Sequence, residues 1–403
     1  MAQPPSNRRA LLLTYHDPQC TNYGAGQRTH FLLKALGQQL PTDVVLFSET
    51  SGANTTSDLP DELGGGKLFR INHEPSSFLD RAWCGLISKR LSKRLAATVD
   101  FDQYNCIVCR YITPYLKCQL PADKPLIIDF DDPVYHVPWL SLRTPRAIIK
   151  ETIKWLNQLI IKWRLKATRL NNATFLFVCE RDQKAFPRLK GALLPNIPAF
   201  PQHPSDYSAS DSKTLLFVGF MSWQPNIIAV DHFLSNIWPL ILKKTPHAHF
   251  RIVGKGTPDN LRRWNAAPNC FAEGYVDDLD DAYKEVAVCV VPVLSGGGSN
   301  IKVPEACAHQ RPVVTSSYSF KGWNNFFVAG QDLLVGESNE DFAHHCIQLL
   351  ADPAYAATIA LNGHRAATAN LSFDAFATRL QHMLESTLVN CLTNRLSNKE
   401  KPL

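Results

Sequence analysis

The sequence of 403 residues lacks long apolar runs. None of its hydrophobic stretches approaches the roughly 20 consecutive apolar residues of a membrane-spanning helix. The N-terminal "MAQPPSNRRALLLTY" has only a short apolar run after its arginines, too short for the core and cleavage site of a signal peptide. We therefore expect a cytosolic protein that is at most peripheral to a membrane.

Dense or regular cysteine patterns are also missing. The 11 cysteines are too few and too irregularly spaced for a disulfide scaffold. Cys106 and Cys109 form a C-x-x-C, but no second pair stands at zinc-ligand spacing. In a strand the two side chains would face opposite sides. We expect buried reduced thiols, a reducing compartment and no metal.

What the sequence does contain is a repeated pattern of short apolar strands. Apolar residues make up 45% of the chain and charged residues 19%, a balance typical of folded proteins. The length exceeds what one hydrophobic core usually supports. Near-continuous apolar strands that alternate with helices indicate parallel sheets covered on both faces, so we predict an α/β protein of two doubly wound, Rossmann-like domains. The strands are predicted at 10–15, 43–48, 106–111, 126–130 and 174–178, then at 214–219, 249–254, 286–293, 311–316 and 332–336.

The boundary between these domains is predicted in 193–213, which holds four prolines and a polar tail without periodicity. The predicted domains are 1–205 and 206–375. Helices are expected at 339–368 and 372–389, the second with Ser372 as its N-cap. Residues 376–403 are predicted to be a helix that crosses back to the first domain, with a frayed tail from Thr393.

A strongly basic segment lies between Trp139 and Leu170. It holds eight Lys and Arg residues and one Glu, a net charge of +7, so the rest of the chain is about neutral. Trp155, Leu159 and Trp163 are interleaved with these charges. The segment fits a solvated helix whose Lys and Arg stems cover apolar surface, and it also fits contact with an anionic membrane or, less well, with nucleic acid.

A glycine-rich loop follows one of the predicted strands, in "PVLSGGGSNIKVPEAC" (292–307). Doubly wound sheets bind ligands where strands end and helices begin. Glycines let a phosphate approach the backbone, and a helix N-terminus offers unpaired N–H groups. By itself the loop fits either a phosphate site or a simple turn.

The surrounding sequence "VVPVLSGGGSNIKVPEACAHQRPVVTSSYSFKGW" resembles the donor-site segment of retaining glycosyltransferases of the GT-B fold, the group 1 (family 4) class. The resemblance extends over 213–380, through "LLFVGFMSWQPN" and "RIVGKG". It is thinner in "NYGAGQRTHFLLKAL" and "LLPNIPA" of the first half. It implies two Rossmann-like domains that face a cleft, with the acceptor bound by 1–205 and a nucleotide-sugar donor bound by 206–375.

The resemblance also implies roles for single residues. Glu305 occupies the place of the glutamate that accepts hydrogen bonds from the ribose hydroxyls of the donor. Gly219 stands in the turn after the first donor-domain strand, and Val276 stands where the backbone contacts the base. Gly24 and Gly26 match the acceptor-domain loop that faces the diphosphate. Backbone N–H groups that meet the diphosphate or the sugar are expected at Gly297, Gly298, Ser299 and Asn300.

Three departures from the family pattern matter. Many members carry a second glutamate that contacts the donor hexose, where this chain has Gly297. The Arg and Lys that usually neutralise the diphosphate are missing from "GFMSWQPN", so Lys302 is the candidate substitute, since leaving-group charge needs a cation or oriented dipoles. Pro304 lacks an N–H and fits only a first helical turn, which leaves the helix start and the reach of Glu305 open.

The stretch "LIIDFDDPVYH" carries carboxylates at a strand end. Asp129-x-Asp131 matches the D-x-D signature by which another glycosyltransferase fold holds a divalent metal, a weaker alternative here. We favour Asp131 or Asp132 as the group that orients the acceptor. Arg28 and Arg110 are further cleft candidates, or structural residues.

We therefore expect a metal-independent glycosyltransferase that acts on a glycan, lipid-linked or small-molecule acceptor, without nucleic acid. Polysaccharide synthesis at the cytosolic face of a membrane fits the basic segment. The leaving phosphate would accept the acceptor proton, so no protein nucleophile is required. Two alternatives stay open: a nucleotide-sugar epimerase of the same fold, and a degenerate module that only binds glycan or a partner.

Overall fold

The computed structural model describes residues 8–21, 23–50, 52–73, 87–131, 145–167, 173–201, 212–296 and 299–399. These residues divide into two compact units. Unit 1 is formed by 8–131, 145–194 and 376–399, and unit 2 by 195–375.

Unit 1 is built on an eight-stranded sheet with the order β3-β4-β2-β1-β5-β6-β7-β8. All neighbouring strands pair in parallel except β3 and β4. The strands are β1 (Ala10–Thr14), β2 (Thr42–Ser48), β3 (Thr55–Asp58), β4 (Lys67–Asn72), β5 (Cys106–Arg110), β6 (Leu126–Asp129), β7 (Ala173–Phe177) and β8 (Gly191–Leu193). The helices are α1 (Gly24–Gly37), α3 (Lys89–Thr98), α4 (Thr113–Lys117), α5 (Pro145–Ala167) and α6 (Glu180–Lys184), with short 3₁₀ turns at Asp61–Leu63 and Phe101–Gln103.

Unit 2 is built on a six-stranded, wholly parallel sheet with the order β11-β10-β9-β12-β13-β14. The strands are β9 (Thr214–Val218), β10 (His249–Val253), β11 (Cys270–Gly274), β12 (Val288–Val291), β13 (Val313–Ser316) and β14 (Leu334–Gly336). The helices are α7 (Gln224–His232), α8 (Trp238–Lys244), α9 (Pro258–Asn265), α10 (Leu279–Tyr283), α11 (Lys302–Ala308), α12 (Ser317–Phe320), α13 (Asn339–Ala351) and α14 (Pro353–Leu371), with a π-helical turn at Phe233–Ile237 between α7 and α8.

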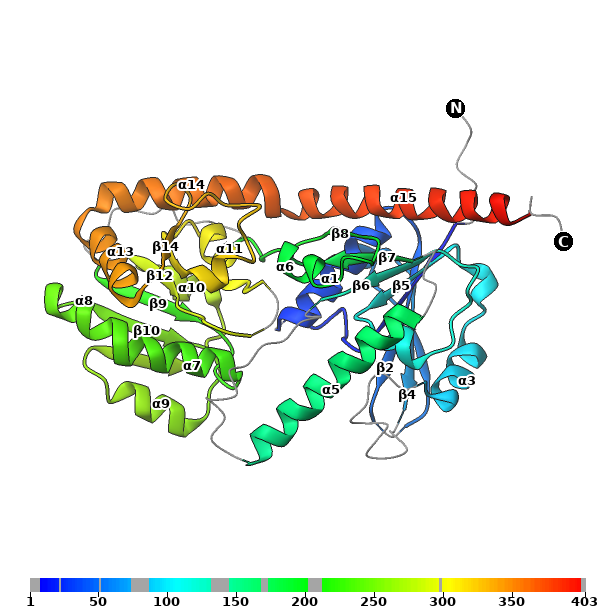
Figure 1. The fold of residues 1–403 in the computed structure, drawn as a ribbon, viewed down its shortest axis with the longest axis horizontal. Helices are drawn as coiled ribbons and strands as arrows, with labels where there is room; N and C mark the ends of the chain where they lie inside the picture. The colour runs from blue at the N-terminus through cyan, green and yellow to red at the C-terminus, as the bar shows by residue number, and fades with distance from the viewer. Residues whose placement is uncertain are drawn as a thin grey trace. The chain divides into compact units, whose positions relative to one another are not determined.

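The last helix, α15 (Phe373–Lys399), belongs to unit 1 from Phe376 onward. It lies along this unit (Figure 1), and its Thr387 hydroxyl donates to the Thr174 hydroxyl of β7 at 2.7 Å. Ser372 caps its first turn, because the Ser372 hydroxyl accepts from the N–H of Ala375 at 3.3 Å. The helix continues to Lys399, so the frayed tail predicted from Thr393 is wrong over most of its length.

The predicted fold class is confirmed, since both units have parallel sheets with helical connections. All ten predicted strands are present. Cys106 and Cys109 are both buried in β5. Cys109 belongs to the core cluster that also holds Cys118, whereas Cys106 lies near Cys391 of α15.

Candidate functional site

The glycine-rich loop of unit 2 lies at the switch point of its sheet. From β9 the chain continues outward to β10 and β11, then crosses to β12 on the other side of β9. Ligands of doubly wound sheets bind at the carboxyl ends of strands at such a reversal. Gly219 follows β9, and the loop before α11 follows β12. The two segments therefore meet where this fold places its ligands.

The described part of this loop is held by hydrogen bonds from neighbouring aromatic residues. The Tyr318 hydroxyl donates to the carbonyl oxygen of Gly296 at 2.6 Å, and the Trp323 indole N–H donates to that of Asn300 at 3.1 Å. Ser299 is buried, and its hydroxyl oxygen lies 3.4 Å from the Asn196 amide nitrogen. Asn300 has a φ of 54°, a left-handed conformation that reverses the chain before α11. Gly297 and Gly298 lie outside the described residues.

Helix α11 settles the position of Pro304. The helix begins at Lys302, and the N–H of Glu305 makes the backbone hydrogen bond to Ile301 at 3.0 Å. Pro304 therefore stands in the first turn, where its missing N–H costs nothing. Because the helix starts at Lys302, both Lys302 and Glu305 are helical, and their spacing of three residues puts them on one face of α11.

Glu305 is fixed by a residue that the sequence did not single out. The Tyr283 hydroxyl, from α10, donates to Glu305 Oε2 at 3.2 Å. The Tyr283 ring stacks on His309 with centroids 4.0 Å apart, and its carbonyl oxygen accepts from Arg311 Nε at 2.7 Å. Glu305 Oε1 makes no hydrogen bond to any residue in the described ranges. Burial raises the pKa of the Glu305 carboxyl, against the effects of the Lys302 charge and the Tyr283 hydrogen bond.

Lys302 fills the space beside Gly219. A side chain at Gly219 would place its Cβ 2.8 Å from Lys302 Cε, so the glycine gives the lysine its room. The ammonium lies 5.7 Å from the Phe217 ring centroid and 5.8 Å from that of Trp223. Burial lowers the pKa of Lys302 to about 8, while the charge of Glu305 limits the fall. The structure thus brings Gly219, Lys302 and Glu305 together.

Two further positions lie at the same edge of this sheet. Val276 follows β11, two strands away from β9. Lys255 follows β10 and is exposed, and its carbonyl oxygen accepts from the N–H of Met221 at 2.9 Å. Lys255 is a second cation that sequence reasoning missed, although "RIVGKG" carried part of the family resemblance.

The carboxyl edge of the unit 1 sheet carries a buried network of ion pairs. Arg110, at the end of β5, has no exposed surface, and its Nη2 donates to Asp131 Oδ2 at 2.9 Å. Its Nη1 lies 3.0 Å from Asp129 Oδ2. Arg28 of α1 lies 2.6 Å from the other Asp129 oxygen. Burial favours protonation of Asp129, but the charges of Arg28 and Arg110 outweigh it and hold its pKa below the usual range.

The contacts of this network distinguish the roles of the acidic and basic residues predicted in unit 1. Asp129 is occupied by two guanidinium groups, which disfavours the D-x-D metal alternative. Arg28 is buried and also donates to the carbonyl oxygen of Leu194 at 3.0 Å, so it has a structural role. Asp131 is 9% exposed and is the carboxylate of this network nearest to solvent. Asp132 lies outside the described residues.

Aromatic side chains lie beside Arg110 at the switch point between β1 and β5, where the Arg110 guanidinium carbon is 3.9 Å from the Tyr111 ring centroid. The His16 ring, just after β1, lies 5.3 Å from that of Tyr111, and its Nδ1 lies 3.3 Å from the Tyr23 hydroxyl. Burial lowers the pKa of His16 to about 4; the Arg110 charge adds to this and the Asp131 charge opposes it. His16 is therefore neutral at physiological pH.

The two glycines predicted in the acceptor-domain loop differ. A Cβ at Gly26 would lie 2.0 Å from the carbonyl oxygen of Cys20, so only glycine fits there. A Cβ at Gly24 would meet nothing within 4 Å. The close approach of the loop to α1 explains Gly26 without a ligand.

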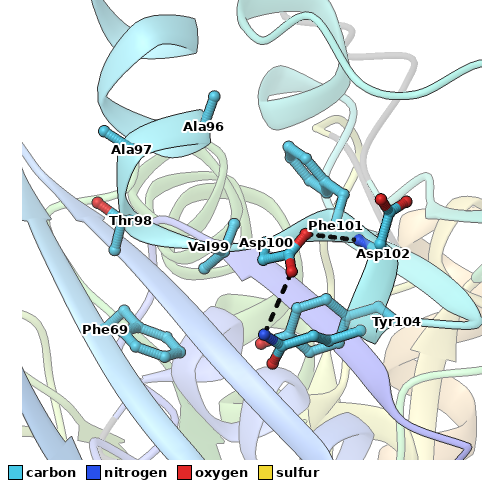
Figure 2. A pocket seen from close by; sticks show the side chains of 10 residues that line it. Phe69, Ala96, Ala97, Thr98, Val99, Asp100, Phe101, Asp102 and Tyr104 are labelled. Carbon is cyan, nitrogen blue, oxygen red and sulfur yellow. Dashed lines mark hydrogen bonds between the residues drawn. The ribbon is translucent and has the colours of Figure 1, made fainter.

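A surface recess of unit 1 lies away from the carboxyl edge of its sheet (Figure 2). It is lined by Phe69 and by residues 96–104, which lead from α3 into β5. It therefore lies near the amino end of β5, away from the edge where doubly wound sheets bind ligands. Its carboxylate Asp100 serves local turns, where it accepts from the N–H of Asp102 at 3.1 Å.

The described ranges lack both a cluster of metal-ligating side chains and a membrane-spanning helix. No three His, Cys, Asp or Glu side chains in them are placed to hold a metal ion. Among the helices of the same ranges, none is long and apolar enough to cross a membrane.

Comparison with known proteins bears on this geometry. Residues 212–352 match the family described as glycosyl transferases group 1. An uncharacterized 44.6 kDa protein of the cps region of Klebsiella pneumoniae is 24% identical over 263 residues. That match covers 61% of this chain and 65% of the relative's length.

Solved structures cover nearly the whole chain. Sucrose-phosphate synthase from Thermosynechococcus elongatus is 15% identical, with a TM-score of 0.67 over 95% of this chain and 99% of that one. HepE of Anabaena, solved with UDP and glucose, is 13% identical, with a TM-score of 0.63 over 94% and 100%. At such identities the likeness shows the fold, while the family match covers the segment with Gly219, Lys302 and Glu305. Residues 212–352 thus match the group 1 glycosyltransferase family, and the chain has the GT-B fold.

Proposed function

We propose that the chain is a glycosyltransferase that moves a sugar from a nucleotide-sugar donor to a glycan or lipid-linked acceptor, with retention at the anomeric carbon. The observation that carries this proposal is the placement of Lys302 beside Gly219 and within the electrostatic influence of Glu305, at the switch point of unit 2. A cation and a carboxylate at this edge fit two parts of a nucleoside diphosphate: the cation fits the phosphates and the carboxylate fits the ribose hydroxyls.

Unit 2 would hold the donor. Glu305 Oε1 is available to accept from ribose hydroxyls, while the Tyr283 hydroxyl occupies the other oxygen. Lys302 and the backbone N–H groups of 297–300 would neutralise the diphosphate, so that no metal is required. Val276 would contact the base through its backbone. Because HepE of Anabaena was solved with UDP, UDP is the first nucleoside diphosphate to test.

Unit 1 would hold the acceptor, with Asp131 as the group that orients the attacking hydroxyl. Its carboxylate lies at the switch point of this sheet and is anchored by Arg110. The acceptor oxygen would bond to the anomeric carbon as the bond from that carbon to the diphosphate oxygen breaks. The acceptor proton would pass to the leaving phosphate. Asp132 remains a second candidate for the orienting role.

The class of acceptor is proposed from the name of a relative. The relative of 24% identity lies in a cps region, which supports a role in polysaccharide synthesis. We place that role at the cytosolic face of a membrane, where lipid-linked acceptors are available.

The test is a turnover panel. The purified chain is incubated with UDP-, GDP- and ADP-sugars, and release of the nucleoside diphosphate is followed. We expect one donor to be turned over selectively, a loss of that turnover in Glu305→Ala, and a product with the donor's anomeric configuration. An isomerised donor without release of diphosphate would identify an epimerase, and an inverted product would refute retention.

A further inference from the structure

Helix α5 exposes a row of apolar side chains, here called the α5 stripe: Ile148, Trp155, Leu159 and Trp163. Their spacing of seven, four and four residues puts them on one face of the helix. They are 45%, 50%, 44% and 68% exposed, in chain order. At 1.5 Å per residue the stripe is about 22 Å long. The exposure of both Trp rings argues against the alternative that Lys and Arg stems cover this surface.

The opposite face of α5 is fixed to unit 1. Leu165 is buried in the core of this unit, and Ile161 packs against the same core. Arg164 Nη1 donates to the carbonyl oxygen of Leu116 at 2.9 Å. These contacts hold the C-terminal half of the helix, while its N-terminal half runs away from the sheet of its own unit (Figure 1). A roll of the helix that buried the stripe would break these contacts.

The charge of the helix indicates what covers the stripe. Residues 145–167 contain six Lys and Arg and one Glu, a net charge of +5. Basic helices with a Trp-containing apolar face bind in the interface of anionic bilayers, where Trp rings are favoured. A nucleic acid would stack on the two Trp rings, but it offers little to Ile148 and Leu159. The mixed aliphatic and aromatic stripe therefore favours lipid.

We propose that the α5 stripe docks unit 1 on an anionic lipid bilayer, with the Trp155 and Trp163 rings at the membrane interface. This inference goes beyond sugar transfer and does not depend on it, because docking is measured without donor or acceptor. Failure of the transferase proposal would leave it standing, and the reverse also holds.

The experiment is co-sedimentation of the full chain with vesicles of phosphatidylcholine alone or of phosphatidylcholine mixed with phosphatidylglycerol. We expect binding to the mixed vesicles only. Raising the ionic strength from about 0.1 M to about 1 M shortens the Debye length from about 10 Å to about 3 Å and should weaken this binding. The double variant Trp155→Ser/Trp163→Ser should partition at least about tenfold less. Phe271→Ser, which removes a 49% exposed aromatic ring from unit 2, is the matched control.

A second measurement uses the unmodified chain, so that a folding defect of the variant does not decide the outcome. Acyl chains brominated near the headgroup should quench tryptophan fluorescence when the mixed vesicles are added. Absence of quenching, equal binding to neutral vesicles, or equal partition of the double variant and the control would overturn the proposal. Trp-dependent binding to duplex DNA or RNA, or Trp-dependent dimerisation, without vesicle binding would also overturn it.

Discussion

Removal of the Glu305 carboxylate is the perturbation whose magnitude the structure allows us to work out. Oε2 accepts from the Tyr283 hydroxyl, and Oε1 is the atom that we propose accepts from the donor ribose. A hydrogen bond to a charged group contributes about 1.5–3 kcal/mol. Since about 1.4 kcal/mol corresponds to tenfold in affinity, Glu305→Ala should weaken binding of the nucleoside diphosphate by about 10- to 150-fold. Glu305→Gln keeps an acceptor oxygen without the charge and should fall between this variant and the unmodified chain.

Isothermal titration calorimetry with UDP measures this loss, and thermal unfolding checks that each variant is folded. Tyr283→Phe is the positioning control, because it keeps the carboxylate and removes only the hydroxyl that orients it. We expect it to cost about 1 kcal/mol or less, about fivefold in affinity. Glu340→Gln, at an exposed position of α13, should change nothing. An unchanged UDP affinity in Glu305→Ala would show that the Glu305 carboxylate does not bind the nucleoside diphosphate.

Three other predictions follow from single residues. Burial lowers the pKa of Lys302 to about 8, so its positive charge is lost as the pH rises through 8. The UDP affinity measured by calorimetry should therefore be constant below pH 8 and fall above it. Lys302→Met should abolish this pH dependence. A Cβ at Gly26 would lie 2.0 Å from the Cys20 carbonyl oxygen, so Gly26→Ala should lower the free energy of unfolding by about 1–3 kcal/mol in urea melts. Gly24→Ala should leave the free energy of unfolding nearly unchanged, and equal effects of the two variants would contradict this packing. Asp131→Asn should lower kcat for transfer and leave UDP affinity unchanged; a change confined to UDP affinity would place Asp131 in donor binding instead.

The central strands could be predicted because burial on both faces leaves a continuous apolar run. The missed strands are less apolar, and most lie at sheet edges. β3 is fully exposed, and β11 alternates buried and exposed residues because only one of its faces packs on the unit. Such short or alternating segments are hard to distinguish from loops in one sequence. The end of α15 was missed for a related reason, since "TNRLSNK" is polar yet continues the helix.

Part of the candidate donor site of unit 2 could be predicted from the sequence. The loop before α11 and the first-turn position of Pro304 follow from strand-to-helix order and from the chemistry of proline. Lys302 was selected because the usual cations were missing, and the contact with Gly219 then placed it at the carboxyl end of β9. The Tyr283–Glu305 hydrogen bond joins α10 to α11 through the packing of two helices, and no spacing in the sequence encodes it.

The ion-pair network of unit 1 was foreseen as a set of candidates but not as a network. Asp129, Arg28 and Arg110 come from three elements that are distant in the chain. Their roles separate only once burial is known, because the buried members pair with each other and Asp131 alone approaches solvent. Sequence patterns locate such residues at strand ends without ranking them.

The most direct test of nucleotide binding by unit 2 is calorimetric titration of the unmodified chain with UDP, GDP and ADP. We expect at least one of them to bind with a Kd below about 1 mM, which corresponds to a binding free energy of about −4 kcal/mol or stronger, and we expect Glu305→Ala to weaken that binding by about 10- to 150-fold. Absence of binding to all three at millimolar concentration would contradict a nucleotide-sugar site in unit 2.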